Sequence, residues 1–193
     1  NHALSASSFY NLNLSYFFKD YHHYLFKDIY TNDPAKPTLY VDNELKQDPP
    51  YSYSIGGTNT SRFRRNTGTY SVKLDWTTQL NQEIAFQFGG EAKQHQIYFH
   101  NINLIPMTDE NGNRVTPYNV TIPPLTTFGH DEYLRKPQEA SAYIQSKFEA
   151  FNLIFNLGVR FDVFNPDGVT LSDPTDPNIY NPLRPSNQFN DLN

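Results

Sequence analysis

The sequence predicts an all-β protein built from antiparallel strands. Five segments without proline alternate apolar and polar residues with a period of two, as strands do when their two faces meet different surroundings. All 14 prolines fall in the stretches 34–50, 106–137 and 166–185, outside those segments, as expected for a residue that cannot donate to a strand ladder. The 14 Tyr and 15 Phe residues also favour strands.

The expected strands lie near residues 9–19, 67–80, 83–99, 138–149 and 152–164. Each has one apolar face that carries no charge, and from the second strand on each opposite face carries at least two charges. The residues that best represent the apolar faces are Leu12, Leu14, Val72, Leu74, Trp76, Phe86, Phe88, Phe155 and Leu157.

The connections alternate between short turns and long polar segments, which we expect at 20–66, 99–136 and 165–193. Loops of this length are unusual in compact soluble domains. A membrane barrel with short periplasmic turns and long outer loops has this rhythm. The sequence therefore predicts part of an up-and-down transmembrane β-barrel, with the apolar faces toward lipid and the charged faces toward the lumen. The strands exceed the roughly 9–11 residues that cross a bilayer, so we expect them to project beyond the outer surface.

Composition excludes several other classes of protein. No apolar stretch approaches the roughly 18 residues of a membrane helix. The net charge of −5 offers no basic field to nucleic acid, and the absence of Cys excludes disulfides and thiolate metal sites. A soluble β-sandwich remains an alternative, because alternating strands can also point their apolar faces into a core. The first residue is Asn and the last stretch is polar and Pro-rich, so we expect the chain to be a piece of a longer protein.

Two segments carry a resemblance to a known family. Ser-Ala-Tyr-Ile-Gln-Ser-Lys-Phe-Glu at 141–149, followed after a short turn by Leu-Ile-Phe-Asn-Leu-Gly-Val-Arg-Phe-Asp-Val-Phe-Asn-Pro at 153–166, resembles a strand hairpin of TonB-dependent outer-membrane receptors. The likeness is to Bacteroidetes-like members that have a carboxypeptidase-regulatory-like N-terminal domain. Residues 4–17 are similar to another hairpin of these barrels. The chain departs from the pattern at Ser146, where the family usually has Asp.

The resemblance implies a barrel of about 22 strands around a plug domain in the bacterial outer membrane. Such a receptor takes up a scarce ligand (a siderophore, cobalamin, a glycan or a peptide) with energy from the TonB complex. The implied partners are outer-membrane lipid and lipopolysaccharide, the unknown ligand, and TonB through a plug region that these residues do not include. The alternatives are a passive porin or adhesin barrel, and a soluble carbohydrate-binding β-sandwich.

Four charged residues are candidates for ligand contacts in the lumen: Glu91, Lys93, Arg160 and Asp162. The competing interpretation is a structural charge ladder between neighbouring strands. In that ladder we expect Arg160 and Asp162 to pair with Lys147 or Glu149 of the preceding strand.

Histidine and arginine residues near the loops supply further candidates. His22 and His23 are adjacent, so in a strand they would point to opposite faces, and they are candidates for an extracellular ligand surface or for a solvated loop. His95, His100 and His130 show no ligand-like spacing, so we predict no metal site and no cofactor.

The only basic cluster, Arg62, Arg64 and Arg65, is expected to contact lipopolysaccharide phosphates or to end a solvated loop. No catalytic motif is visible, so we do not expect an enzyme.

Overall fold

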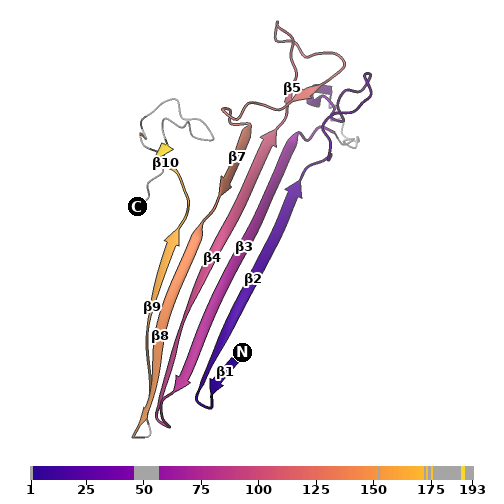
Figure 1. The fold of residues 1–193 in the computed structure, drawn as a ribbon. Coiled ribbons are helices and arrows are strands. Elements are labelled where there is room, and N and C mark those ends of the chain that lie inside the picture. Colours follow the sequence, from indigo (N-terminus) through magenta and orange to yellow (C-terminus); the bar gives the residue numbers. More distant parts are fainter. Residues whose placement is uncertain are drawn as a thin grey trace, which may run out of the picture.

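The computed structural model describes residues 2–45, 57–151, 153–171, 173, 175 and 188–189, and the statements below refer to these residues. They form one long antiparallel sheet with the strand order β1-β2-β3-β4-β8-β9, and β7 pairs with β4 beyond the end of β8 (Figure 1). The prediction of an all-β antiparallel fold is confirmed. Within the described residues the sheet is open, because its outermost strands β1 and β9 do not pair with each other.

All five expected strands are present. The sheet contains β1 (His2–Ser5), β2 (Ser8–His23), β3 (Ser61–Gln79), β4 (Ile84–Asn103), β7 (His130–Arg135), β8 (Gln138–Ala150) and β9 (Leu153–Asn165). The smaller elements are η1 (Asn43–Leu45), β5 (Ile105–Pro106), β6 (Val120–Thr121), β10 (Thr170–Leu171) and β11 (Gln188–Phe189). No helix among the described residues is long and apolar enough to cross a membrane.

The pairing of the three longest strands runs without a bulge. The β2–β3 register is continuous from Ser8 opposite Thr78 to His23 opposite Phe63, and the β3–β4 register is equally continuous over the 19 residues of β3. Because side chains alternate strictly between faces, an unbroken register keeps each face in line across all the strands. The predicted apolar positions therefore fall on one side of the sheet, which we call the apolar face. Its cross-strand pairs include Leu12 with Leu74, Val72 with Ala92, Phe88 with Ile144, and Ile144 with Val159.

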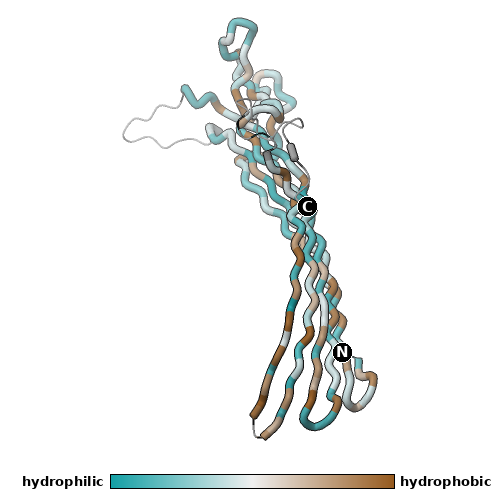
Figure 2. Tube along the Cα trace, turned by 90° about the vertical axis from the view of Figure 1, so that its left-hand side faces the viewer, coloured by the Kyte–Doolittle hydropathy of each residue, from teal (hydrophilic) through white to brown (hydrophobic). Residues whose placement is uncertain are grey.

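No second layer covers the apolar face among the described residues. Leu14 is 72% exposed, Leu157 64% and Val159 73%. Figure 2 shows hydrophobic residues recurring along the lower strands and hydrophilic residues predominating above them. Among the residues that the structure describes, buried hydrophobic side chains occur only at the upper end, where Tyr40, Ile102, Leu104 and Val120 form a small core. We call β1, β8, β9 and the parts of β2, β3 and β4 beside them the lower sheet. It buries little apolar surface within its own chain.

The predicted loop boundaries at 20–66 and 99–136 are wrong. β2 continues to His23, β3 begins at Ser61, and β4 continues to Asn103. These strand ends mix polar, charged and aromatic side chains without a strict alternation, so hydropathy does not reveal them. The strands are held instead by backbone pairing, which has no hydropathy signature. The predicted loop at 165–193 lies mostly outside the described residues.

The second predicted loop also contains a whole strand. β7 and β8 keep a common register against β4, with Arg135 opposite Ile97 and Gln138 opposite Gln94. Pro137 interrupts them because it has no N–H to donate, although its carbonyl still accepts a hydrogen bond from the His95 N–H at 2.9 Å.

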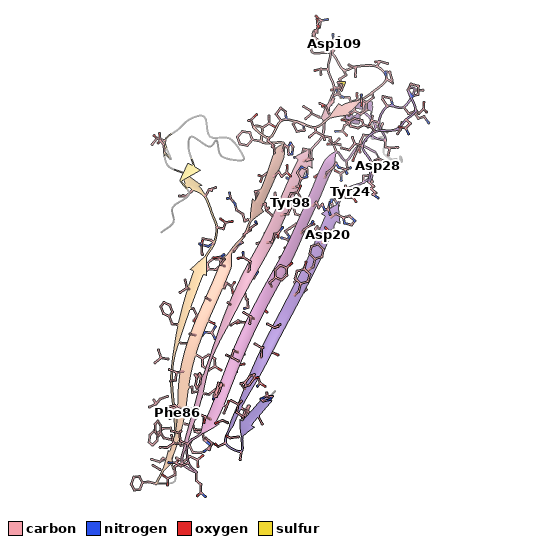
Figure 3. All side chains as sticks on the ribbon, viewed as in Figure 1. Asp20, Tyr24, Asp28, Phe86, Tyr98 and Asp109 are labelled. Carbon is pink, nitrogen blue, oxygen red and sulfur yellow. The ribbon has the colours of Figure 1, made fainter. Side chains whose placement is uncertain are left out.

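The described parts of the two long connections, 24–45 with 57–60 and 104–129, pack with the upper ends of β2, β3, β4 and β7 into a unit that we call the head. Phe26, Ile29 and Tyr118 pack against its small core. Arg114 forms ion pairs with Asp42 and Glu44 and so joins the two connections. Figure 3 shows Asp109 at the far tip of the head, with Tyr24 and Asp28 beside the strand ends. Phe86 lies at the opposite end of the sheet (Figure 3).

Candidate functional site

The side of the sheet opposite the apolar face carries the charged residues of β3, β4, β8 and β9, and we call it the polar face. Its ion pairs include Lys73 with Asp75 at 3.1 Å, Lys93 with Glu91 at 3.3 Å, Lys93 with Glu139 at 3.6 Å, and Arg160 with Asp162 at 2.8 Å. All are at least partly exposed, so solvent screens them and each adds little to stability. The pairs order the side chains more than they stabilise the sheet.

The predicted partners of Arg160 and Asp162 are wrong. Arg160 lies opposite Tyr143 and pairs with Asp162 on its own strand, whereas Lys147 pairs with Glu149 four residues further along β8. The sequence gives the face of each charged residue but not the strand register that determines its neighbour. Residues two apart on one strand share a face, so they can pair without any particular register.

Tyr143 crosses β4 to reach a third strand. Its hydroxyl donates a hydrogen bond to Asp75 Oδ1 at 2.7 Å, although Tyr143 is on β8 and Asp75 is on β3. Gly89 of β4 lies opposite both residues in the register and has no side chain to block the ring. A Cβ added at Gly89 would lie 2.8 Å from the Tyr143 ring and 2.5 Å from the backbone oxygen of Leu74. The glycine therefore permits this three-strand contact.

The four charged candidates lie together. One open groove on the polar face is lined by Glu91, Lys93, Glu139, Arg160 and Asp162. A second groove continues from it past Lys73, Tyr143 and Gln145. Acidic and basic groups alternate along this surface, which suits a ligand with several polar groups better than one of a single charge.

An aromatic ladder lies on the same face where the strands enter the head. Tyr21, Phe63, Phe99 and Tyr133 come from β2, β3, β4 and β7, and their ring centroids are 5.7, 5.3 and 4.8 Å apart in that order. The Arg135 guanidinium lies 5.9 Å from the Tyr133 ring centroid. Half-exposed rings on a polar surface offer flat apolar area to planar or sugar-like ligands. The sequence pattern does not single out Phe63, Phe99 and Tyr133, because cross-strand pairing alone aligns them.

His22 and His23 do not belong to the polar groove. Both lie at the upper end of β2, and their adjacency in the strand points them to opposite faces, as the sequence predicts. His22 lines a groove with Asp20, Arg64 and His100 on the apolar-face side of the head. His23 lies opposite Phe63, on the side of the aromatic ladder.

The basic cluster is divided between the two faces of β3. Arg62 and Arg64 continue the apolar face into the head, whereas Arg65 points to the other side. Arg62 donates hydrogen bonds to the carbonyl oxygens of Phe26 at 2.5 Å and Lys27 at 2.8 Å. Arg64 is 53% exposed and pairs with Asp20 at 3.3 Å. The cluster is therefore part of a strand, and the Arg62 guanidinium binds the backbone at the start of the connection between β2 and β3.

A group of three metal-ligating side chains lies beside this cluster. Strand pairing brings His100 of β4 opposite Glu132 of β7, and His130 lies two residues before Glu132 on the same face of β7. The Nε2 atoms of the two histidines are 3.0 Å apart, and the Tyr98 hydroxyl donates to Glu132 Oε1 at 2.7 Å. The predicted absence of a metal site rested on sequence spacing, which does not show these partners.

Burial and charge shift two pKa values in this group. Burial lowers the pKa of His100 below its usual 6.5, and the neighbouring His130, Arg62 and Arg64 act in the same direction against the opposing effect of the Glu132 carboxylate. Burial and the neighbouring Glu132 carboxylate raise the pKa of Tyr98 to about 12. Tyr98 therefore keeps its proton at neutral pH and remains a hydrogen-bond donor to Glu132.

Comparisons with protein-family models, with curated proteins and with solved structures found no match to this chain.

Proposed function

We propose that this chain forms part of the β-barrel of an outer-membrane receptor that takes up a scarce ligand with energy from TonB. The observation that carries the barrel proposal is the uncovered apolar face of a single-layered sheet whose other face is charged. In water such a face would be a large exposed apolar patch, which soluble proteins rarely tolerate. In a bilayer it is the expected outer surface of a barrel strand.

The lengths of the strands support the same arrangement. β8 and β9 have 13 residues each, whereas β3 has 19 and β4 has 20. About 9–11 tilted residues cross the hydrocarbon, so the longer strands would carry the head beyond the outer surface. On the apolar-face side, the apolar residues end near Tyr16 and Tyr70, whose ring centroids are 4.6 Å apart, and charged residues begin at Asp20 and Arg64. Tyrosine is typical of the membrane interface.

The open edges of the sheet also need partners. β9 pairs only with β8, and most of β2 pairs only with β3. Because unpaired backbone groups are costly in hydrocarbon, a membrane sheet must close into a barrel. In the proposed receptor, further strands beyond those described complete the barrel.

Uptake would use the polar face. The groove lined by Glu91, Lys93, Arg160 and Asp162 would face the lumen, and the aromatic ladder would lie at its outer mouth. A ligand could first contact ring surfaces and then polar groups deeper in the barrel. The coupling to TonB rests on the sequence resemblance, whereas a passive barrel would use the same faces without it.

Cysteine labelling tests the assignment of the two faces, because the chain has no native Cys. Lys73→Cys and Leu74→Cys place single thiols on adjacent residues of β3, on opposite faces. In cells assembling the complete gene product, a water-soluble maleimide should label Lys73→Cys and spare Leu74→Cys. Labelling of both positions, or of Leu74→Cys alone, would refute the proposed membrane orientation.

A transport assay separates an energised receptor from a passive barrel. Cells producing the complete protein are given siderophores, cobalamin, oligosaccharides or peptides, with TonB present or deleted. The proposal predicts uptake of one of these ligand classes only when TonB is present. Uptake that is independent of TonB, together with ion conductance in a planar bilayer, would establish the passive alternative.

A further inference from the structure

The inference concerns the side chains of His100, His130 and Glu132, on the apolar-face side of the head. We propose that these three residues bind one divalent transition-metal ion of the zinc class, through Nε2 of each histidine and one carboxylate oxygen. The ligand atoms lie within 4.8 Å of one another. This site is independent of the proposed transport function and would clasp β7 to β4.

The hydrogen bond on the far side of one imidazole prepares it to bind a metal. His130 Nδ1 lies 2.7 Å from the carbonyl oxygen of Pro123. A carbonyl can only accept, so Nδ1 carries the proton and Nε2 of neutral His130 presents a lone pair. This is the arrangement that orients metal-ligating histidines in many proteins. His130 is 9% exposed, so its ring has little freedom to turn away.

The spacing of the nitrogen atoms fits a metal ion after a small movement. Zn–N bonds of about 2.0–2.1 Å in a tetrahedral site place two nitrogen atoms about 3.3 Å apart. The Nε2 atoms of His100 and His130 are 3.0 Å apart, so opening the pair by a few tenths of an ångström would admit the ion. Neutral His100 would then hold its proton on Nδ1 and offer the Nε2 lone pair, so no net proton is released.

The third ligand has its own support. The Tyr98 hydroxyl occupies Glu132 Oε1, and the carboxylate has a second oxygen with which to bind the ion. Tyr98 is a positioning residue, because it would act on the metal through Glu132. Two imidazoles and a carboxylate favour Zn²⁺, Ni²⁺ or Cu²⁺ over Mg²⁺ and Ca²⁺, which prefer oxygen ligands alone.

The two arginines near the site are engaged by other groups, so they do not prevent a cation from binding. Arg62 and Arg64 are nearby on β3 and would repel the ion. However, Arg62 is directed to the carbonyl oxygens of Phe26 and Lys27, and Arg64 is directed to Asp20. The groove that His100 shares with His22 gives access from the surface. A fourth coordination position would be left for water, as in many three-ligand zinc sites.

The test is a Zn²⁺ titration of the purified full chain in detergent, measured by calorimetry. We expect one saturable ion per chain. His100→Gln and His130→Gln should each weaken binding by about tenfold or more, and Tyr98→Phe, which keeps the ring, by about tenfold. Asp131→Asn is the matched control, because it removes a neighbouring carboxylate that points to the opposite face of β7, and it should bind as tightly as the unaltered chain.

A second measurement separates this site from Zn²⁺ bound elsewhere, for example at His22 and His23. Zn²⁺ should slow amide hydrogen exchange in β7 and upper β4 while leaving β9 unchanged. Co²⁺ should give the visible absorption of a four-coordinate complex. The proposal is overturned if the unaltered chain binds no Zn²⁺ saturably, if His100→Gln and His130→Gln bind Zn²⁺ as tightly as the unaltered chain, or if bound Zn²⁺ leaves exchange in β7 unchanged.

Discussion

The lower sheet and the head are made by the same strands but are stabilised differently. The lower sheet has one apolar face that nothing in the described chain covers, with Leu14 and Val159 more than 70% exposed. The head buries a core of its own, in which Val120 is fully buried. It also holds its connections with specific pairs such as Arg114 with Asp42 and Glu44. The lower sheet therefore depends on its surroundings for stability, whereas the head depends on contacts within the chain.

The largest expected effect comes from placing a charge on the apolar face of the lower sheet. Leu157→Arg should destabilise the assembled protein by about 2–4 kcal/mol if the residue lies near the bilayer midplane. The matched change Asn156→Arg puts the same side chain on the polar face and should be tolerated. Heat-modifiable migration on a denaturing gel measures assembly in membranes. Equal tolerance of both changes would mean that the apolar face does not meet lipid.

A smaller effect is expected on the other face of the lower sheet. Gly89→Ala would force Tyr143 away and move the backbone near Leu74, because the new Cβ would contact both. Overpacking of this kind costs about 1–3 kcal/mol. Tyr143→Phe is the comparison, since it removes only the hydrogen bond to Asp75. Urea unfolding in detergent should give Gly89→Ala a lower free energy of unfolding than Tyr143→Phe. The reverse order would show that the space at Gly89 is not needed.

In the head, truncation of a core residue should act locally. Val120→Ala deletes about two methylene equivalents from a fully buried side chain, which corresponds to about 1–2 kcal/mol. We expect faster proteolysis of the connections 24–60 and 104–129, while membrane assembly remains normal. Val159→Ala, on the exposed apolar face, should leave that proteolysis unchanged. Loss of membrane assembly in Val120→Ala would show that the two regions are not separable.

The smallest expected effect is a response of the head to pH. His100 faces Glu132 and His130 on β7 and Arg62 and Arg64 on β3, and its pKa in the folded head lies below the usual 6.5. The stability that depends on neutral His100 is therefore present above pH 6.5 and is lost as pH falls through the folded pKa. Amide exchange in β7, corrected for intrinsic rates, should rise on acidification while exchange in lower β3 does not. His100→Gln should remove the response, and its persistence would assign it to another group.

The two faces of the lower sheet were predictable from sequence because they follow a strict period of two. Leu12, Leu74 and Phe88 lie on the apolar face as predicted, and Glu91 and Arg160 lie on the other. Strand identity was predictable for the same reason, since alternation between unlike faces is what identifies a strand.

Features that depend on register were not predictable. β7 lies within a polar, Pro-rich stretch, and its pairing with β4 joins residues about thirty positions apart. The same pairing creates the group of His100, His130 and Glu132 and aligns Phe99 with Tyr133. No hydropathy pattern records which residue lies opposite which, so the sequence also gave the wrong partner for Arg160.

The hydrogen bonds from Arg62 to the connection between β2 and β3 affect how far the length and sequence of that connection can change. Its guanidinium fastens the backbone at Phe26 and Lys27 directly beside the strand from which Arg62 extends. We call the segment between this fastening and β3 the lobe, and both of its ends are therefore held at the same strand. Doubling the length of a flexible lobe costs only about 0.6 kcal/mol. Insertions in this lobe that spare Tyr40, Asp42 and Glu44, which contact the rest of the head, would thus leave the β2–β3 hairpin intact, so new surface specificities could be acquired without redesigning the sheet.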